Sequence, residues 1–127
     1  MLLKECINVY KAFQVISESQ LPLVTGWAIA QNMSKLQPLV ESFEEHRQTY
    51  IDQLRTKATV DSDGEPKIAD DDAADFKKQV EALLNEDEKV RLKKVELIDD
   101  GTLSIAPTVL MAAMDFLTLK PHADKVS

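Results

Sequence analysis

An apolar seam with alternating steps of four and three residues runs through the middle of this chain and restricts its fold more than any other feature. The seam consists of Ile29, Met33, Leu36, Val40, Phe43, Arg47, Tyr50 and Leu54. This spacing places every member on one side of an α-helix, as in coiled coils. Pro22 suits the first turn of that helix, because its φ is already helical and it has no N–H to leave unpaired. The sequence therefore predicts one helix over residues 22–57, about 50 Å long.

Pro38 lies inside this predicted helix. A proline there removes one backbone hydrogen bond and clashes with the carbonyl of Ser34, so a kink is expected. The seam keeps its phase on both sides of Pro38, which favours one bent helix over two unrelated helices.

A shorter amphipathic helix precedes the long one. Its apolar residues recur at steps of three and four and are Leu3, Cys6, Ile7, Tyr10, Phe13 and Ile16. The pattern predicts a helix that ends near residues 17–19, followed by a turn over residues 18–21. Such a helix covers only about half of the long one, so the second half of the seam needs another partner.

A third helix over residues 72–85 is long enough to cover part of that second half. Its apolar side carries Phe76, Val80, Leu83 and Leu84. Asp71 or Asp72 is the expected N-cap, and acidic residues at that end also suit the helix dipole.

The period changes after residue 85. Val90 and Leu92 alternate with basic residues, and Val95 and Leu97 resume the alternation one residue out of phase, which indicates a strand with a bulge at residues 93–94. Residues 99–101 form the expected turn, with Gly101 available for positive φ, and residues 102–105 return as a second strand. The sequence thus predicts a β-hairpin at about residues 89–105.

A last helix is expected to begin at Pro107 and to end before Pro121. It carries Val109, Leu110, Ala113, Met114 and Leu117. The predicted fold class is therefore mainly α (α+β): a long helical hairpin with a kinked second helix, further helices and a small β-hairpin. A single domain covers residues 1–118, with an acidic loop at about residues 58–71, and residues 119–127 are expected to form a flexible tail.

The chain is acidic, with 22 Asp and Glu against 15 Lys and Arg among 127 residues and a net charge of −7. Residues 61–75 hold seven acidic residues and only Lys67, so the excess is local. Their composition is typical of a solvated linker. The acidic balance argues against direct nucleic-acid binding, which needs a Lys and Arg face. No apolar run approaches the length of a membrane span and no signal peptide is evident, so we expect no membrane association.

No catalytic, metal or cofactor motif is recognisable. His46 and His122 have no partners at a metal-binding spacing. Residues 61–64 begin like a calcium loop, but Gly64 falls at the fourth position and not the sixth. No glycine-rich phosphate loop is present. Cys6 falls on an apolar helix face and is expected to be a buried thiol. We therefore expect no enzyme, no cofactor, no metal and no small-molecule substrate.

The remaining candidates are residues that contact a protein partner. Arg47 interrupts the seam, so it either meets an acidic residue of another helix, extends to the edge, or marks where intramolecular cover ends and a partner begins. Trp27, Tyr10 and Tyr50 are expected to pack in or beside the core. The candidate partner-binding residues are Phe43, Arg47, Tyr50 and Leu54 on the long helix and Asp70, Asp71 and Asp72 in the acidic segment.

The order of these parts resembles a family of small uncharacterised proteins of tailed bacteriophages and prophages, described only as a phage domain of unknown function. The residues that carry the likeness are Leu21, Pro22, Val24, residues 28–33, Lys35, Leu36, Glu44, Glu45, Arg47, residues 63–65, Phe76, residues 80–84, the strand through Val95 and the helix at Pro107. The likeness spans about residues 2–118. It implies a phage-encoded protein found in the host bacterial cytoplasm during infection or in the virion, and it assigns no functional residues.

Two functions are compatible with these features. The first is a non-enzymatic phage protein that acts by protein–protein contact or self-association, as an assembly factor or minor virion component. The alternative is an acidic host-directed inhibitor that blocks a basic nucleic-acid-binding surface of a host or defence protein. A stable helical domain with a binding surface elsewhere is a third possibility.

Overall fold

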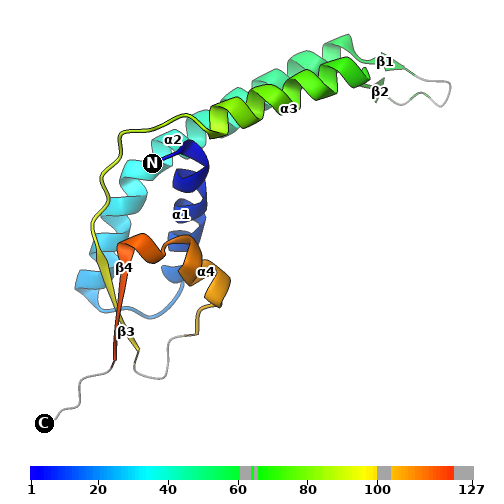
Figure 1. Cartoon of the computed structure of the whole chain (residues 1–127). Helices are drawn as coiled ribbons and strands as arrows, with labels where there is room; N and C mark the ends of the chain where they lie inside the picture. The colour runs from blue at the N-terminus through cyan, green and yellow to red at the C-terminus, as the bar shows by residue number, and fades with distance from the viewer. Residues whose placement is uncertain (61–63, 65, 100–103, 122–127) are drawn as a thin grey trace, which may run out of the picture.

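A computed structural model describes residues 1–60, 64, 66–99 and 104–121. Its elements are α1 (Leu3–Ile16), α2 (Leu23–Lys57), β1 (Thr59–Val60), β2 (Pro66–Lys67), α3 (Asp70–Leu84), β3 (Val95–Asp99), α4 (Pro107–Ala112), the 3-10 turn η1 (Met114–Phe116) and β4 (Leu117–Pro121). Figure 1 shows two parts. The body contains α1, the first half of α2, β3, α4, η1 and β4. The arm contains α2 from Phe43 onward, β1, β2 and α3, and it projects away from the body. The mainly helical prediction with a small β element is confirmed.

The long helix forms as one unit through Pro38. Pro22 precedes its first residue, so the predicted bounds are correct to within one position. Figure 1 shows that α2 bends about midway, where the body meets the arm. Ile29, Leu36, Val40 and Leu54 of the seam are buried. In the body α1 packs against α2, and in the arm α3 packs against α2. The long helix therefore has one partner helix for each half, as predicted.

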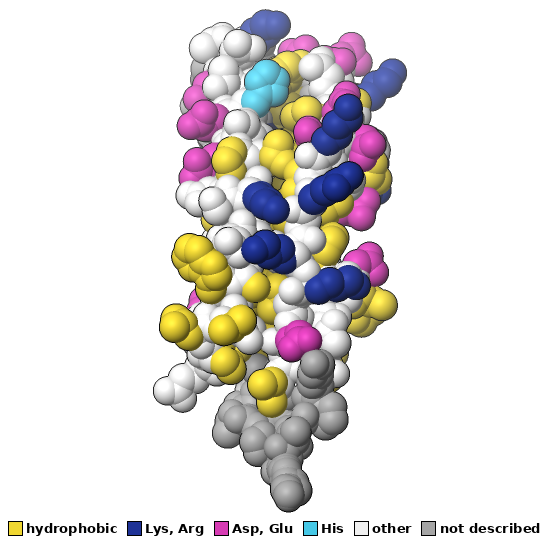
Figure 2. Space-filling view, turned by 90° about the vertical axis from the view of Figure 1, so that its left-hand side faces the viewer, with side chains coloured by type: hydrophobic (Ala, Val, Ile, Leu, Met, Phe, Trp, Pro, Cys, Tyr) yellow, Lys and Arg dark blue, Asp and Glu magenta, His cyan; other side chains and the backbone are white. Residues whose placement is uncertain are grey.

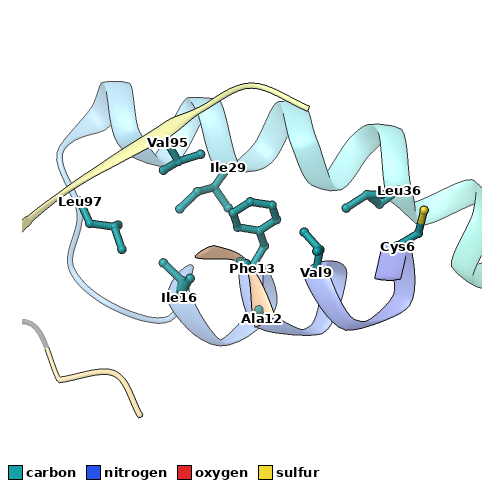
Figure 3. Close-up of a cluster of buried hydrophobic side chains, with 10 residues drawn as sticks. Cys6, Val9, Ala12, Phe13, Ile16, Ile29, Leu36, Val95 and Leu97 are labelled. Carbon is teal, nitrogen blue, oxygen red and sulfur yellow. The ribbon is translucent and has the colours of Figure 1, made fainter. Parts of the chain in front are cut away.

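The core of the body lies between α1, α2 and β3. Its largest fully buried side chains are Phe13, Ile16, Ile29, Leu36, Leu97 and Val95. Figure 3 shows Phe13 pointing from α1 toward Ile29 of α2, with Val95 and Leu97 of β3 on the adjoining side. Burying side chains of this size contributes about 1.5–3 kcal/mol each, so this cluster supplies most of the driving force for joining the helices to the strand.

The predicted β-hairpin is wrong. β3 pairs in parallel with β4, in a register that places Val95 opposite Leu117 and Asp99 opposite Pro121. Residues 104–106 form no strand, and residues 100–103 of the predicted turn and second strand lie outside the described residues. A parallel pair needs a crossover connection, and here that connection contains α4 and η1.

The last helix and the tail also differ from the prediction. α4 ends at Ala112, five residues before Leu117, which was expected to be helical. Residues 117–121 instead form β4, so the first part of the predicted tail is a strand, while residues 122–127 lie outside the described part. The physical reason is burial: pairing with β3 places Leu117 of β4 against the body core.

The segment before β3, residues 88–94, is an extended strap along α2 and not the predicted bulged strand. Side chains of α2 satisfy its backbone. The Asn32 amide donates to the Lys93 carbonyl (2.9 Å) and accepts from the Lys93 N–H (2.8 Å), while Lys35 Nζ donates to the Arg91 carbonyl (2.8 Å). Thr25 Oγ1 continues the series by donating to the carbonyl of Glu96 in β3 (3.1 Å). The strap therefore has a helix as its hydrogen-bonding partner.

The described part of the acidic segment contains more regular structure than predicted. The prediction of an acidic loop over residues 58–71 is corrected by β1 and β2, which pair antiparallel with Thr59 opposite Lys67, and by α3, which starts at Asp70. Residues 61–63 and 65 lie outside the described residues. Ala69 is the N-cap and makes no side-chain capping bond, so the expected caps Asp71 and Asp72 are wrong. They lie with Asp70 inside the first turn, where the helix dipole favours negative charge.

Candidate interaction site on the helical arm

An open groove of about 280 Å³ lies where α2 and α3 run side by side in the arm. It is lined by Phe43, His46, Arg47 and Tyr50 of α2, by Phe76, Gln79, Val80, Ala82 and Leu83 of α3, and by Glu86. This set is called the arm groove below. Three of the residues singled out from the sequence, Phe43, Arg47 and Tyr50, therefore line one surface. They meet because the seam places them on the same face of α2.

An aromatic pair forms the floor of the arm groove. The rings of Tyr50 and Phe76 are stacked with their centroids 5.4 Å apart and their planes 23° from parallel. The guanidinium carbon of Arg47 lies 5.9 Å from the centroid of the Phe76 ring, within the range of a cation–π contact. Arg47 is itself exposed. Of the alternatives for this seam position, the structure favours the edge of the helix pair, with an aromatic ring in place of an acidic partner.

A small polar network joins the two helices beside this pair. The Tyr50 hydroxyl donates to Asp75 Oδ2 (3.0 Å). The Gln79 amide donates to the same carboxylate oxygen (2.8 Å) and to the Tyr50 oxygen (3.1 Å). The hydrogen bond to the Asp75 carboxylate raises the pKa of Tyr50 above its ordinary value, because it favours the protonated phenol. The network fixes the position of the Tyr50 ring over Phe76.

Two of the candidate residues on α2 are less accessible than the sequence suggested. Leu54 is only 6% exposed, so it is unavailable to a partner unless the arm opens. Phe43 is half-buried and packs against the small cluster of Leu3, Ile7 and Val40. It therefore links the arm groove to the body.

The acidic candidates lie apart from the arm groove. Asp70 and Asp71 are exposed and Asp72 is half-buried, and none of them lines the groove. They occupy the end of α3 that is farther from the body, next to β2 (Figure 1). The arm thus carries an aromatic groove along its length and a cluster of negative charge near its end.

Sequence reasoning missed some of the surface. Phe76 was assigned to the covering face of the third helix, but its ring also meets Arg47 in the groove. Trp27, expected to pack in or beside the core, is 64% exposed, and the nearby Leu23 and Val24 are 89% and 81% exposed. Tyr10 is half-buried against both core clusters, as expected. The apolar pair Leu23 and Val24 directly after Pro22 was the one available signal of this exposed patch.

Other candidate chemistry is limited in the described part of the chain. Cys6 is fully buried, as predicted, and its burial raises the pKa of the thiol. Among the described residues, no three His, Cys, Asp or Glu side chains gather closely enough to hold a metal ion. The same residues include no helix with both the length and the apolar composition needed to cross a membrane. His122 lies outside them.

Comparison with known proteins provides no relative to guide the assignment. No protein-family model matches this chain, and no curated protein or solved structure is significantly similar to it.

Proposed function

We propose that this chain is a phage-encoded, non-enzymatic protein that acts by protein–protein contact, as an assembly factor or minor virion component, in the host cytoplasm during infection or in the virion. The arm is the part that docks the partner. The observation that carries this proposal is the open arm groove, in which Tyr50 and Arg47 each pack on the ring of Phe76, with the half-buried Phe43 in the same lining.

The composition of the arm groove suits a protein partner. Aromatic residues and arginine are enriched among the residues that dominate binding energy at interfaces. The Tyr50 ring is held in place by Asp75 and Gln79, so little conformational entropy is lost when a partner side chain packs against it. The groove is open and has polar groups at its rim, as docking sites for a partner's apolar side chain have.

The experiment is site-specific photo-crosslinking in infected cells, followed by mass spectrometry of the adducts and of purified particles. A photoreactive residue replaces His46 in the arm groove, and a control chain carries it at Gln53, which is exposed on α2 and does not line the groove. Adducts with capsid or tail proteins from position 46 and not from position 53 support the proposal. Equal labelling from both positions contradicts it.

A charge reversal tests the same surface independently. Arg47→Glu places a carboxylate over the Phe76 ring and should weaken partner capture at least about tenfold, since a hot-spot residue contributes about 2 kcal/mol or more. Arg55→Glu is the matched control, because Arg55 lies two turns further along α2 and is exposed. If both variants capture the partner as well as the unchanged protein does, the arm groove is not the docking site.

The acidic cluster supports the alternative function, a host-directed inhibitor. Asp70, Asp71 and Asp72 follow one another in the first turn of α3, where they present negative charge to a basic nucleic-acid-binding surface. Replacing all three with Asn should weaken binding to such a host protein at low salt. Replacing the exposed Glu41, Glu44 and Glu45 with Gln removes equal charge from the middle of α2 and should have little effect. Equal losses of binding in the two variants would mean that only the net charge of the chain matters, which contradicts a specific role of the acidic cluster.

A further inference from the structure

A second hollow on the molecule has the opposite charge to the arm end. It holds about 830 Å³ of open space between the strap and α2, close to Pro38. Lys35, Lys89 and Arg91 line it, and all three are exposed. Asp87 and Glu88 also line it, and the Asp87 carboxylate accepts a hydrogen bond from the Met1 amine (3.1 Å). This hollow is called the basic groove. Figure 2 shows Lys and Arg side chains in a column on the same side of the molecule.

An apolar patch lies at the start of α2, the helix that also carries Lys35. Leu23, Val24 and Trp27 lie at spacings of one, three and four on the first two turns of α2, so they share one outward face of the helix. Figure 2 shows hydrophobic side chains grouped below the basic column. Three large apolar side chains that are 64–89% exposed and adjacent on one face are typical of an interaction surface.

The chain itself carries the complementary surface. Residues 61–75 account for nearly all of the net charge, and Asp70 and Asp71 at the start of α3 are exposed. The chain cannot bring this acidic end to its own basic groove, because the arm points away from the body (Figure 1). A separate molecule can do so.

We propose that the basic groove binds the acidic end of the arm of a second copy of this chain. Asp70 and Asp71 of one copy face Lys35, Lys89 and Arg91 of the next, and the exposed Leu23, Val24 and Trp27 at the start of the same helix offer additional apolar contact. The two surfaces differ, so the contact either closes as a two-fold dimer, in which each arm end meets the other copy's basic groove, or repeats head-to-tail as a ring or an open chain. This inference deepens the proposed function and rests on it: the chain is its own first partner in assembly.

Salt and concentration control such an association. Exposed ion pairs contribute little individually and are screened by salt, so several pairs and the apolar patch must act together. The mass measured by light scattering should rise with protein concentration at about 20 mM salt and return toward the monomer at about 500 mM salt.

Paired charge reversals make the test specific. One variant carries Lys35→Glu and Arg91→Glu in the basic groove, and the other carries Asp70→Lys and Asp71→Lys at the arm end. Each alone should associate at least about tenfold more weakly, because the first variant has two negative surfaces and the second places lysines opposite Lys35, Lys89 and Arg91. An equimolar mixture should associate again, since each variant complements the other. Circular dichroism confirms that both variants remain helical.

Matched controls carry the same changes elsewhere. Lys4→Glu with Lys11→Glu alters exposed positions of α1, and Glu44→Lys with Glu45→Lys alters exposed positions of α2. Both should associate as the unchanged protein does. A chain that is strictly monomeric at low salt overturns the inference, as does association that survives both reversals, or a mixture that stays monomeric. Binding of single-stranded DNA or anionic vesicles through Lys35 and Arg91, without self-association, also overturns it. In each case crosslinking from position 46 still tests the proposed function, so the two can fail separately.

Discussion

Asn32 is the residue whose replacement tests the architecture most directly. Its side chain is fully buried under the strap, and its amide makes two hydrogen bonds with the backbone of one residue, Lys93. Asn32→Ala removes both bonds and leaves the Lys93 N–H and carbonyl without their partner. It also leaves space where the amide was. The strap should then detach from α2 more easily, and with it the start of β3.

The expected cost follows from these contacts. Each hydrogen bond contributes about 0.5–1.5 kcal/mol net, and a buried group left without a partner costs about 1–3 kcal/mol. The Lys93 backbone is only partly buried, so water can satisfy some of the lost bonding. We expect Asn32→Ala to lower the free energy of unfolding by about 2–3 kcal/mol. Asn32→Asp should cost more at neutral pH, because it buries a carboxylate against the Lys93 carbonyl.

The measurement is urea unfolding followed by far-UV circular dichroism. Burial raises the pKa of the new carboxyl group, so the cost of Asn32→Asp should shrink as the pH falls toward about 4, because the protonated group can donate to the carbonyl. Lys35→Ala is the control on the same strap, since its bond to the Arg91 carbonyl is exposed and should contribute less than about 0.5 kcal/mol. If Asn32→Ala costs no more than Lys35→Ala, the strap does not depend on Asn32 and the reasoning is refuted.

Three further predictions concern the body. Phe13→Ala should lower the free energy of unfolding by about 3–5 kcal/mol, measured by urea unfolding, because the ring fills the centre of the core; a loss under about 1 kcal/mol would contradict the packing. The buried Cys6 thiol should react with a thiol reagent only at the rate of unfolding. The pKa of the Cys6 thiol is raised in the folded state, so its contribution to the free energy of unfolding should be intact below about pH 8.5 and should decrease at higher pH. Cys6→Ala should remove this decrease. In the Cys6→Ala background, Glu96→Cys and Thr118→Cys, which are opposite in β3 and β4, should form a disulfide on mild oxidation, and its absence on a non-reducing gel would count against parallel pairing.

The helices could be predicted because their signal is local. Apolar residues at steps of three and four predict the extent of α2 to within one residue and the end of α1 to within one to three residues. The pairing of β3 could not be predicted in this way. Val95 and its partner Leu117 are separated by a crossover, and the apolar spacing after Pro107 is compatible with a helix that continues through Leu117. Whether residues 117–121 form a helix or a strand depends on their pairing with β3. That pairing exists only once the body has assembled, so the local sequence does not show it.

The strap shows a different limit. The alternation of Val90 and Leu92 with basic residues predicts a strand, and these two side chains do pack against the core from an extended segment. The segment nevertheless lacks a neighbouring strand, because Asn32 and Lys35 of α2 take over its hydrogen bonding. A buried asparagine cannot be distinguished from an exposed one by its position in the sequence alone. The hydrogen bonds between Asn32 and the strap therefore could not be predicted.

The error at Trp27 has a geometric cause. Each residue of an α-helix turns about 100°, so Trp27 lies about 200° around α2 from Ile29 of the seam. Trp27 is close to Ile29 in sequence, but on the helix it lies on the opposite side and faces solvent. The candidate residues Phe43, Arg47 and Tyr50 were found correctly as neighbours because they follow the seam itself.

The charged position in the seam explains why a groove exists at all. Up to Val40 and Phe43 the seam is covered from the side of α1, and further along the arm it is covered by α3. Arg47 lies within the part of the seam that α3 covers, because Leu83 and Leu84 of α3 already pack beside Val40 and the Phe76 ring of α3 lies under the guanidinium. An apolar residue there would draw α3 closer, whereas a guanidinium keeps its charge in water and rests on the face of Phe76. The charge at this seam position therefore favours an open groove between α2 and α3 over a closed coiled-coil contact.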